Sequence, residues 1–79
     1  MEIKVLGSGC SKCKALEKAT VQALSELDLD IAVDKEEDIM KIMSYGVMRT
    51  PGLVINEKVV HSGSVPSVNE IKNLINQNL

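Results

Sequence analysis

Two cysteines separated by two residues are the side chains of this sequence best suited to chemistry. They lie in the run Cys10-Ser11-Lys12-Cys13 of a 79-residue chain. Because cysteine thiolates attack disulfides and bind soft metal ions, the pair could exchange electrons as a dithiol and disulfide, or it could carry a metal.

The cysteine pair lies where the sequence changes from the pattern of a strand to the pattern of a helix. Residues 2–6 alternate roughly between polar and apolar side chains and end at Gly7, which predicts a first strand. From about Ser11 onward, apolar side chains recur every three or four residues, which predicts an amphipathic helix. Its apolar face comprises Leu16, Ala19, Thr20, Ala23, Leu24 and Leu27.

At this junction the two sulfurs are expected to differ in reactivity. Cys10 would stand at or before the first helical residue, where unsatisfied N–H groups and the helix dipole favour the thiolate. Lys12 and Lys14 add positive charge nearby. Cys13 would lie one turn into the helix, within reach of Cys10 but more buried. We therefore expect Cys10 to be the catalytic nucleophile and Cys13 to resolve the mixed disulfide.

Other uses of the two cysteines compete with this interpretation. A structural disulfide closing four residues would stabilise the fold by only about 2 kcal/mol, and a reducing compartment would tend to break it. Small copper chaperones hold Cu(I) between two cysteines with this spacing. Zinc fits less well, since it prefers four ligands and the chain offers the two cysteines and His61. Two inert buried cysteines and a binding module without turnover are further alternatives.

The rest of the chain predicts a further alternation of strands and helices. We expect strands at 29–33, 53–55 and 58–61, and helices at 35–45 and from 67 onward. The resulting order, β-α-β-α-β-β-α, predicts an α/β fold with a mixed four-stranded sheet and helices on both faces. A chain of this length has room for a single domain, 1–79.

Turn and cap residues mark the ends of several predicted elements. They are Gly46 as the stop of the second helix, Asn56-Glu57 as a tight hairpin turn, and Ser67 with Glu70 as a capping box.

The inward faces of the second helix and the following loop are less sharply defined. In the second helix we expect Ile39, Ile42 and Met43 to point inward. Met48 could serve a docking surface near the sulfurs or lie in the core, and we expect the core.

Composition narrows the classes of partner. The hydrophobic fraction is 44%, but Tyr45 is the only aromatic residue and the net charge is −2. Base stacking and binding to phosphate charge are therefore not expected, and we predict no nucleic-acid partner.

The first residues lack the apolar run of a signal peptide, and no stretch has the length of a membrane span. We therefore expect a cytoplasmic protein that does not bind membranes, in a compartment where thiols are kept reduced.

Taken with its element order, the chain resembles the thioredoxin/glutaredoxin superfamily, in particular the small thioredoxin-like proteins of archaea and bacteria. The resemblance spans the whole chain and depends on Cys10-Ser11-Lys12-Cys13 between a strand and a helix, Thr50-Pro51 before a strand, and Gly63 in the closing region. It implies a thioredoxin-like fold and a thiol–disulfide oxidoreductase, or electron carrier, that needs no cofactor.

The resemblance also implies roles for particular residues and partners. Members of the superfamily have a cis-proline at the position of Pro51, and the backbone of the preceding residue, here Thr50, pairs with an extended substrate. The implied partners are a protein that contains a disulfide and a donor of the thioredoxin-reductase or glutathione kind. The sequence does not determine the oligomeric state, and we expect a monomer.

The chain departs from the superfamily pattern at three places. Ser-Lys replaces the Gly-Pro of thioredoxins and the Pro-Tyr of glutaredoxins between the cysteines, Gly9 replaces the usual Trp, and Lys4 occupies the nearest spacing to the buried acid of thioredoxins. The redox potential, the natural reductant and the proton acceptor for Cys13 are therefore not determined by the resemblance.

Overall fold

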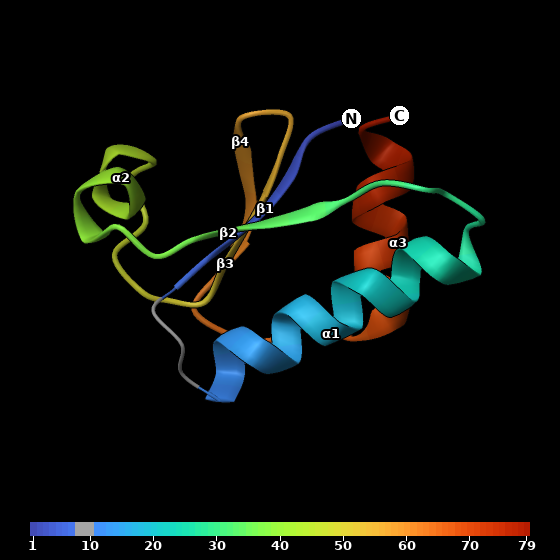
Figure 1. Ribbon diagram of the computed structural model, residues 1–79, viewed down its shortest axis with the longest axis horizontal. Helices are drawn as coiled ribbons and strands as arrows, with labels where there is room; N and C mark the ends of the chain where they lie inside the picture. The colour runs from blue at the N-terminus through green and yellow to red at the C-terminus, as the bar shows by residue number, and fades with distance from the viewer. Residues whose placement is uncertain (8–10) are drawn as a thin grey trace.

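The computed structural model describes residues 1–7 and 11–79, which form four strands and three helices (Figure 1). The elements in chain order are β1 (Ile3–Leu6), α1 (Ser11–Glu26), β2 (Val33–Glu36), α2 (Ile39–Ser44), β3 (Gly52–Ile55), β4 (Lys58–Ser62) and α3 (Val68–Gln77). The order β-α-β-α-β-β-α is the predicted one. Within the described residues, no helix has the length and apolar character needed to span a membrane.

The strands form one mixed sheet in the order β2-β1-β3-β4. Strand β1 pairs with β2 in parallel and with β3 antiparallel, and β3 pairs antiparallel with β4. In this register, Leu6 at the end of β1 lies opposite Gly52 at the start of β3. The segment after β1, which leads to the cysteines, therefore begins beside the segment that carries Thr50 and Pro51.

Helices cover both faces of the sheet, as predicted. Helices α1 and α3 pack against each other on one face, and α2 lies apart from them (Figure 1). The larger core, on the face of α1 and α3, comprises Ile3, Val5, Leu16, Ala23, Leu24, Leu53, Ile55, Ile71 and Ile75. The smaller core, on the face of α2, comprises Leu6, Ile42, Val47 and Val54. Adjacent residues of β1 and β3 enter different cores because strand side chains alternate between faces.

The local turn and cap predictions are confirmed. The Ser67 hydroxyl accepts a hydrogen bond from the Glu70 N–H (3.2 Å), which caps α3. Asn56 and Glu57 both have positive φ, 52° and 68°, as a tight hairpin turn between β3 and β4 requires. Gly46, with φ +80°, follows α2 and donates its N–H to the Met43 carbonyl.

The second strand differs from its prediction. Strand β2 begins at Val33, where the predicted strand 29–33 ends. Leu29 and Ile31 still pack against the larger core, but from an extended connection before the strand. The alternation of apolar residues identified the core-facing side chains correctly. It could not identify which residues pair with β1, because that depends on where α1 ends.

The prediction of a helix at 35–45 was wrong at its start. Residues 35 and 36 belong to β2, and α2 begins only at Ile39. The side chain of Asp38 caps this short helix by accepting a hydrogen bond from the Met40 N–H (2.9 Å). Glu36 suits a helix N-terminus, but backbone pairing with β1 holds it in an extended conformation.

Three residues expected to be inward are instead exposed. Ile42 is buried, but Ile39 and Met43 are 69% and 64% exposed. Met48 is 97% exposed, so its expected place in the core was wrong. A helix of six residues presents little more than one inward side chain per turn, and Ile42 fills that place.

Candidate functional site

The candidate site begins at Gly7, directly after β1. Gly7 has a φ of +154° and donates its N–H to the Glu36 carbonyl of β2 (2.9 Å). A Cβ built on Gly7 would overlap the Sγ of Cys13, and would lie 3.2 Å from the Cβ of Cys13 and 3.7 Å from the Cβ of Thr50. The sulfur of Cys13 therefore packs directly on the backbone of Gly7, and Thr50 approaches the same point.

Cys13 occupies the first turn of α1, as the helical pattern predicted. It is 5% exposed and is not a free thiol. Cys10 lies outside the described residues, so its assignment as nucleophile stays a prediction from the sequence. Cys13 is buried, as the sequence analysis expected of the resolving cysteine. The expectation that Cys10 is more accessible stays a prediction.

Thr50 and Pro51 form the opposite wall of the site. The peptide bond between them is cis. The Pro51 side chain is fully buried, whereas Thr50 is exposed, and the Pro51 carbonyl accepts a hydrogen bond from the Gly63 N–H (2.9 Å). Gly63 has a φ of +85°, a conformation that glycine adopts readily. The structure thus brings Thr50, Pro51, Gly63 and Cys13 together across the ends of β1 and β3.

Charged residues lie around Cys13, and of these the sequence analysis had singled out Lys14 alone. A cavity of about 60 Å³ is lined by Val5, Gly7, Cys13, Lys14, Glu17, Lys35 and Glu37. Within this group, Glu17 of α1 and Lys35 of β2 form an ion pair of 3.0 Å. The sequence did contain a signal for Glu17, since residues four apart on a helix share one face. No comparable signal existed for Lys35, whose position depends on the register between β1 and β2.

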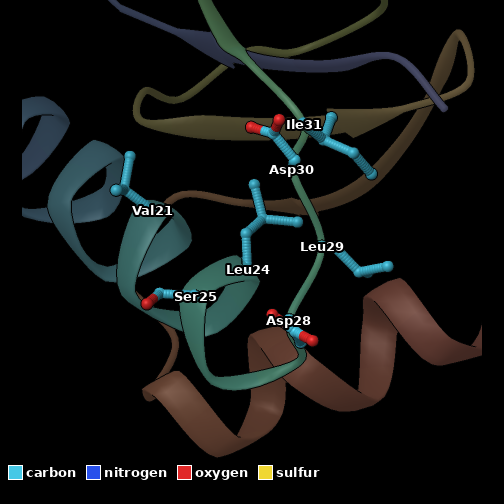
Figure 2. Close-up of a pocket in the computed structure, with 7 residues that line it drawn as sticks. All are labelled: Val21, Leu24, Ser25, Asp28, Leu29, Asp30 and Ile31. Atoms are coloured by element: carbon cyan, nitrogen blue, oxygen red, sulfur yellow. The ribbon is translucent and has the colours of Figure 1, made fainter.

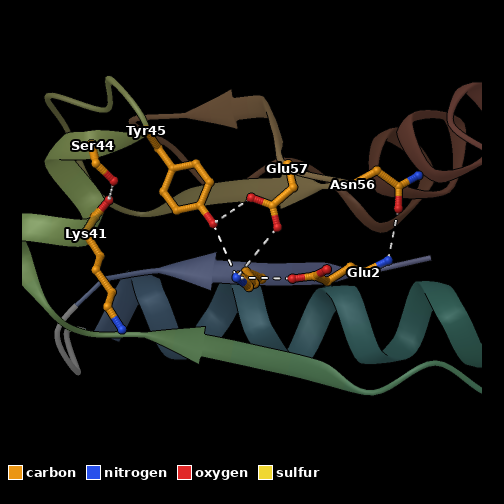
Figure 3. Close-up of polar contacts among 7 residues, drawn as sticks. Glu2, Lys41, Ser44, Tyr45, Asn56 and Glu57 are labelled. Carbon is orange, nitrogen blue, oxygen red and sulfur yellow. Dashed lines mark hydrogen bonds and ion pairs between the residues drawn. The ribbon is translucent and has the colours of Figure 1, made fainter.

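Lys4 lies on the other face of β1 and takes no part in this cluster. Its Nζ lies 3.1 Å from Glu2, 3.3 Å from the hydroxyl of Tyr45 and 4.0 Å from Glu57. Figure 3 labels these three partners. The hydrogen bond to Glu2, followed by that to Tyr45, raises the pKa of Lys4 above its usual range. Because strand side chains alternate, Lys4 points to the face of α2 whereas Val5 points toward Cys13.

A second hollow, at the far end of α1, is separate from the cysteine site. It is lined by Val21, Leu24, Ser25, Asp28, Leu29, Asp30 and Ile31 (Figure 2). Ser25 follows Cys13 by twelve residues of helix, which corresponds to about 18 Å along the axis.

His61, weighed above as a metal ligand, lies on β4 with its Nε2 2.8 Å from the Ser64 hydroxyl.

Known proteins are similar to this chain in sequence. A family model described as a thioredoxin domain matches residues 1–76. The thioredoxin of Methanothermobacter thermautotrophicus is 33% identical over 75 residues, which cover 95% of this chain and 97% of that protein. The thioredoxin of Methanocaldococcus jannaschii is 36% identical over 70 residues, covering 89% of this chain and 80% of that protein. The chain therefore belongs to the thioredoxin family.

Proposed function

We propose that the protein is a thiol–disulfide oxidoreductase that works through Cys10 and Cys13. The observation that carries the proposal is the packing of the Cys13 sulfur on Gly7, with Thr50 at the same point. This arrangement holds one sulfur of the Cys-x-x-Cys pair at the start of a helix and at the end of the two central strands. A substrate that reaches Thr50 would therefore lie beside the sulfur that completes the reaction.

The proposed reaction proceeds in two exchanges. The Cys10 thiolate attacks a sulfur of the partner disulfide, which forms a mixed disulfide and releases one partner thiolate. Cys13 then loses its proton and attacks the Cys10 sulfur, which releases the second partner thiolate and leaves the Cys10–Cys13 disulfide. Two electrons pass from the protein to the partner, and a thiol donor returns them. Burial of Cys13 favours the resolving role, because a partner disulfide cannot easily reach it.

Thr50 and Pro51 are proposed as the substrate-binding residues. Thr50 is exposed at the site, so an extended substrate segment can reach this residue. Pro51 is buried and has no N–H, so it adds no donor that would compete for the sulfurs. The hydrogen bond from Gly63 to the Pro51 carbonyl holds this wall in place.

The proposed substrate, electron donor and compartment are those that this reaction requires. The substrate is a protein disulfide, and the donor is a reductase of the thioredoxin-reductase kind or the glutathione system. We expect the chain to act as a single-domain monomer in the cytoplasm, with neither nucleic acid nor membrane as partner.

A redox titration tests the proposal. The purified protein, checked for bound metal, is equilibrated in dithiol buffers of graded potential, and its free thiols are counted by mass spectrometry. We expect one two-electron transition that Cys10→Ser and Cys13→Ser each abolish. A protein that resists oxidation and binds copper stoichiometrically would contradict the proposal and favour a metal carrier.

A further inference from the structure

Three positively charged residues without an ion-pair partner belong to the two walls of the candidate site. Lys12 and Lys14 flank Cys13 in the first turn of α1, and Arg49 directly precedes Thr50 in the opposite wall. All three are exposed. The ion pairs among the described residues use other lysines, so these three cations keep their full charge toward solvent.

Packing on Gly63 holds the side chain of Arg49 at the site. A Cβ built on Gly63 would lie 3.6 Å from the Cβ of Arg49 and 3.7 Å from its Cδ. Because both atoms approach the same point, the stem of Arg49 runs along the backbone of Gly63. Gly63 in turn donates its N–H to the Pro51 carbonyl (2.9 Å). The stem of Arg49 is therefore held against the wall that Thr50 and Pro51 form.

The cavity beside Cys13 adds little negative charge to oppose these cations. Lys14 lines this cavity together with Glu17, Lys35 and Glu37. Glu17 and Lys35 compensate each other in their 3.0 Å ion pair. Of the carboxylates that line the cavity, Glu37 alone has no ion pair within the described part of the chain. Three uncompensated cations therefore stand against one uncompensated carboxylate, although the net charge of the chain is −2.

Other acidic residues are engaged elsewhere or lie far from Cys13. The Glu36 carboxylate accepts a hydrogen bond from the Asp38 N–H (3.2 Å), and the Asp38 carboxylate caps α2. Asp28 and Asp30 line the hollow beyond the far end of α1. That end of the helix is about 18 Å from Cys13, which exceeds the Debye length of about 10 Å at 0.1 M salt.

We propose that Lys12, Lys14 and Arg49 select disulfides that carry carboxylates next to their cysteines. The inference rests on the proposed function and adds the charge of the preferred substrate. A carboxylate beside the reacting disulfide meets lysines on one wall and an arginine on the other, and the arginine can bind both carboxylate oxygens. A lysine or arginine in the same place on the substrate is repelled.

This selection acts on the approach of the partner and leaves the exchange itself unchanged. Two electrons still pass to the partner disulfide, whose two sulfurs leave as thiolates while the Cys10–Cys13 disulfide forms. Attraction between opposite charges mainly speeds the encounter of two molecules, and salt weakens it. The preferred substrate is therefore recognised by its rate of reaction and by the dependence of that rate on salt.

The test compares two peptide disulfides that differ only in charge. Each is a symmetrical dimer of a pentapeptide with blocked ends, whose cysteine has a glutamate on either side in one peptide and a lysine on either side in the other. The reduced protein, freed of excess reductant, reacts with each peptide in a single turnover. Each rate is divided by the rate with dithiothreitol, an uncharged dithiol, which corrects for the intrinsic reactivity of the peptide.

We expect the glutamate peptide to react faster than the lysine peptide. At low salt the corrected rates should differ about tenfold, as two uncompensated charges at close range in water imply. At about 0.5 M salt the difference should fall to within about twofold, because exposed charges are then screened.

Variants assign the preference to particular side chains. Lys12→Gln, Lys14→Gln and Arg49→Gln should each lower the ratio of the two rates about threefold. The ratio is the readout because a change in the reactivity of the sulfurs affects both peptides alike. Arg49→Lys should keep most of the ratio, since it keeps the charge. Lys58→Gln is the matched control: this residue begins β4 at the opposite end of the sheet, so the ratio should not change.

Other results would overturn the inference. Equal corrected rates, or a faster reaction of the lysine peptide, would show that the three cations do not select the substrate. A preference that survives both high salt and the neutralising variants would come from other contacts. An equal loss in Lys58→Gln would attribute the preference to the net charge of the chain. A parent protein that reduces neither peptide would overturn the proposed function itself, whereas a parent that reduces both equally overturns the charge selection alone.

Discussion

The backbone of Gly7 contacts the sulfur of Cys13, at a distance that leaves no room for a Cβ at position 7. Gly7 also has a φ of +154°, which side chains rarely allow. Position 7, directly after β1, therefore requires glycine for two separate reasons, one conformational and one steric.

Replacing this glycine should destabilise the protein more than replacing a glycine with free space. We expect Gly7→Ala to lower the free energy of unfolding by about 3 kcal/mol, from overpacking against Cys13 in addition to backbone strain. Gly46→Ala is the matched control: its φ is +80°, but a Cβ there would meet nothing within 4 Å. It should cost about 1–2 kcal/mol. Urea unfolding measures both, and equal losses would contradict the close contact at Gly7.

The Glu17–Lys35 ion pair should set the reactivity of the Cys13 thiol. In a Cys10→Ser background, Glu17→Gln removes a negative charge from the cavity and should speed alkylation of Cys13 about threefold, because the remaining Lys35 favours the thiolate. Lys35→Met should slow it. Alkylation at neutral pH is followed by mass spectrometry. Glu26, at the other end of α1, forms a 3.2 Å ion pair with Lys72 of α3. Glu26→Gln breaks that pair and should leave the alkylation rate of Cys13 unchanged.

The roles of the two cysteines can be separated by trapping. Cys13→Ser should leave Cys10 able to attack but unable to be released, so mixed disulfides with a protein substrate should accumulate on non-reducing gels. Cys10→Ser should trap little, since Cys13 is only 5% exposed. Trapping by Cys10→Ser alone would reverse the assignment.

Pro51 should affect exchange as well as stability. Its side chain is fully buried, so Pro51→Ala should cost about 1–2 kcal/mol through lost apolar contact. It also adds an N–H next to Thr50 and disturbs the wall that Thr50 forms, so the rate of disulfide exchange should fall at least about tenfold. Pro66→Ala removes another buried proline, before α3, and should lower stability without changing the exchange rate. Parallel changes in both variants would make Pro51 purely structural.

Where signals are local, the sequence alone determined the elements. The cap formed by Ser67 and Glu70, the turn at Asn56-Glu57 and the apolar stripe of α1 depend on contacts between residues that are close in the chain. Hydrophobic periodicity then indicated which side chains face the core, and hence an α/β sheet covered on both faces.

Positions that depend on pairing with a distant segment could be decided only by the tertiary structure. Lys35 and Glu36 carry helix-compatible side chains, yet they pair with β1 as a strand. The exposure of Met43 and Met48 depends on how little of the short α2 the smaller core can cover. Neither outcome has a signal within a local window of sequence.

In the candidate site, too, some features could be predicted from the sequence and others depended on the tertiary structure. The spacing of Cys10 and Cys13 and the Thr50-Pro51 pair predicted the chemistry from sequence. The contact of Gly7 with Cys13, the approach of Thr50 and the Glu17–Lys35 pair were decided by the tertiary structure. These contacts require the end of β1, the start of α1, β2 and the start of β3 to meet at one end of the strands. Strand register and packing determine that meeting, and both are properties of the whole folded chain.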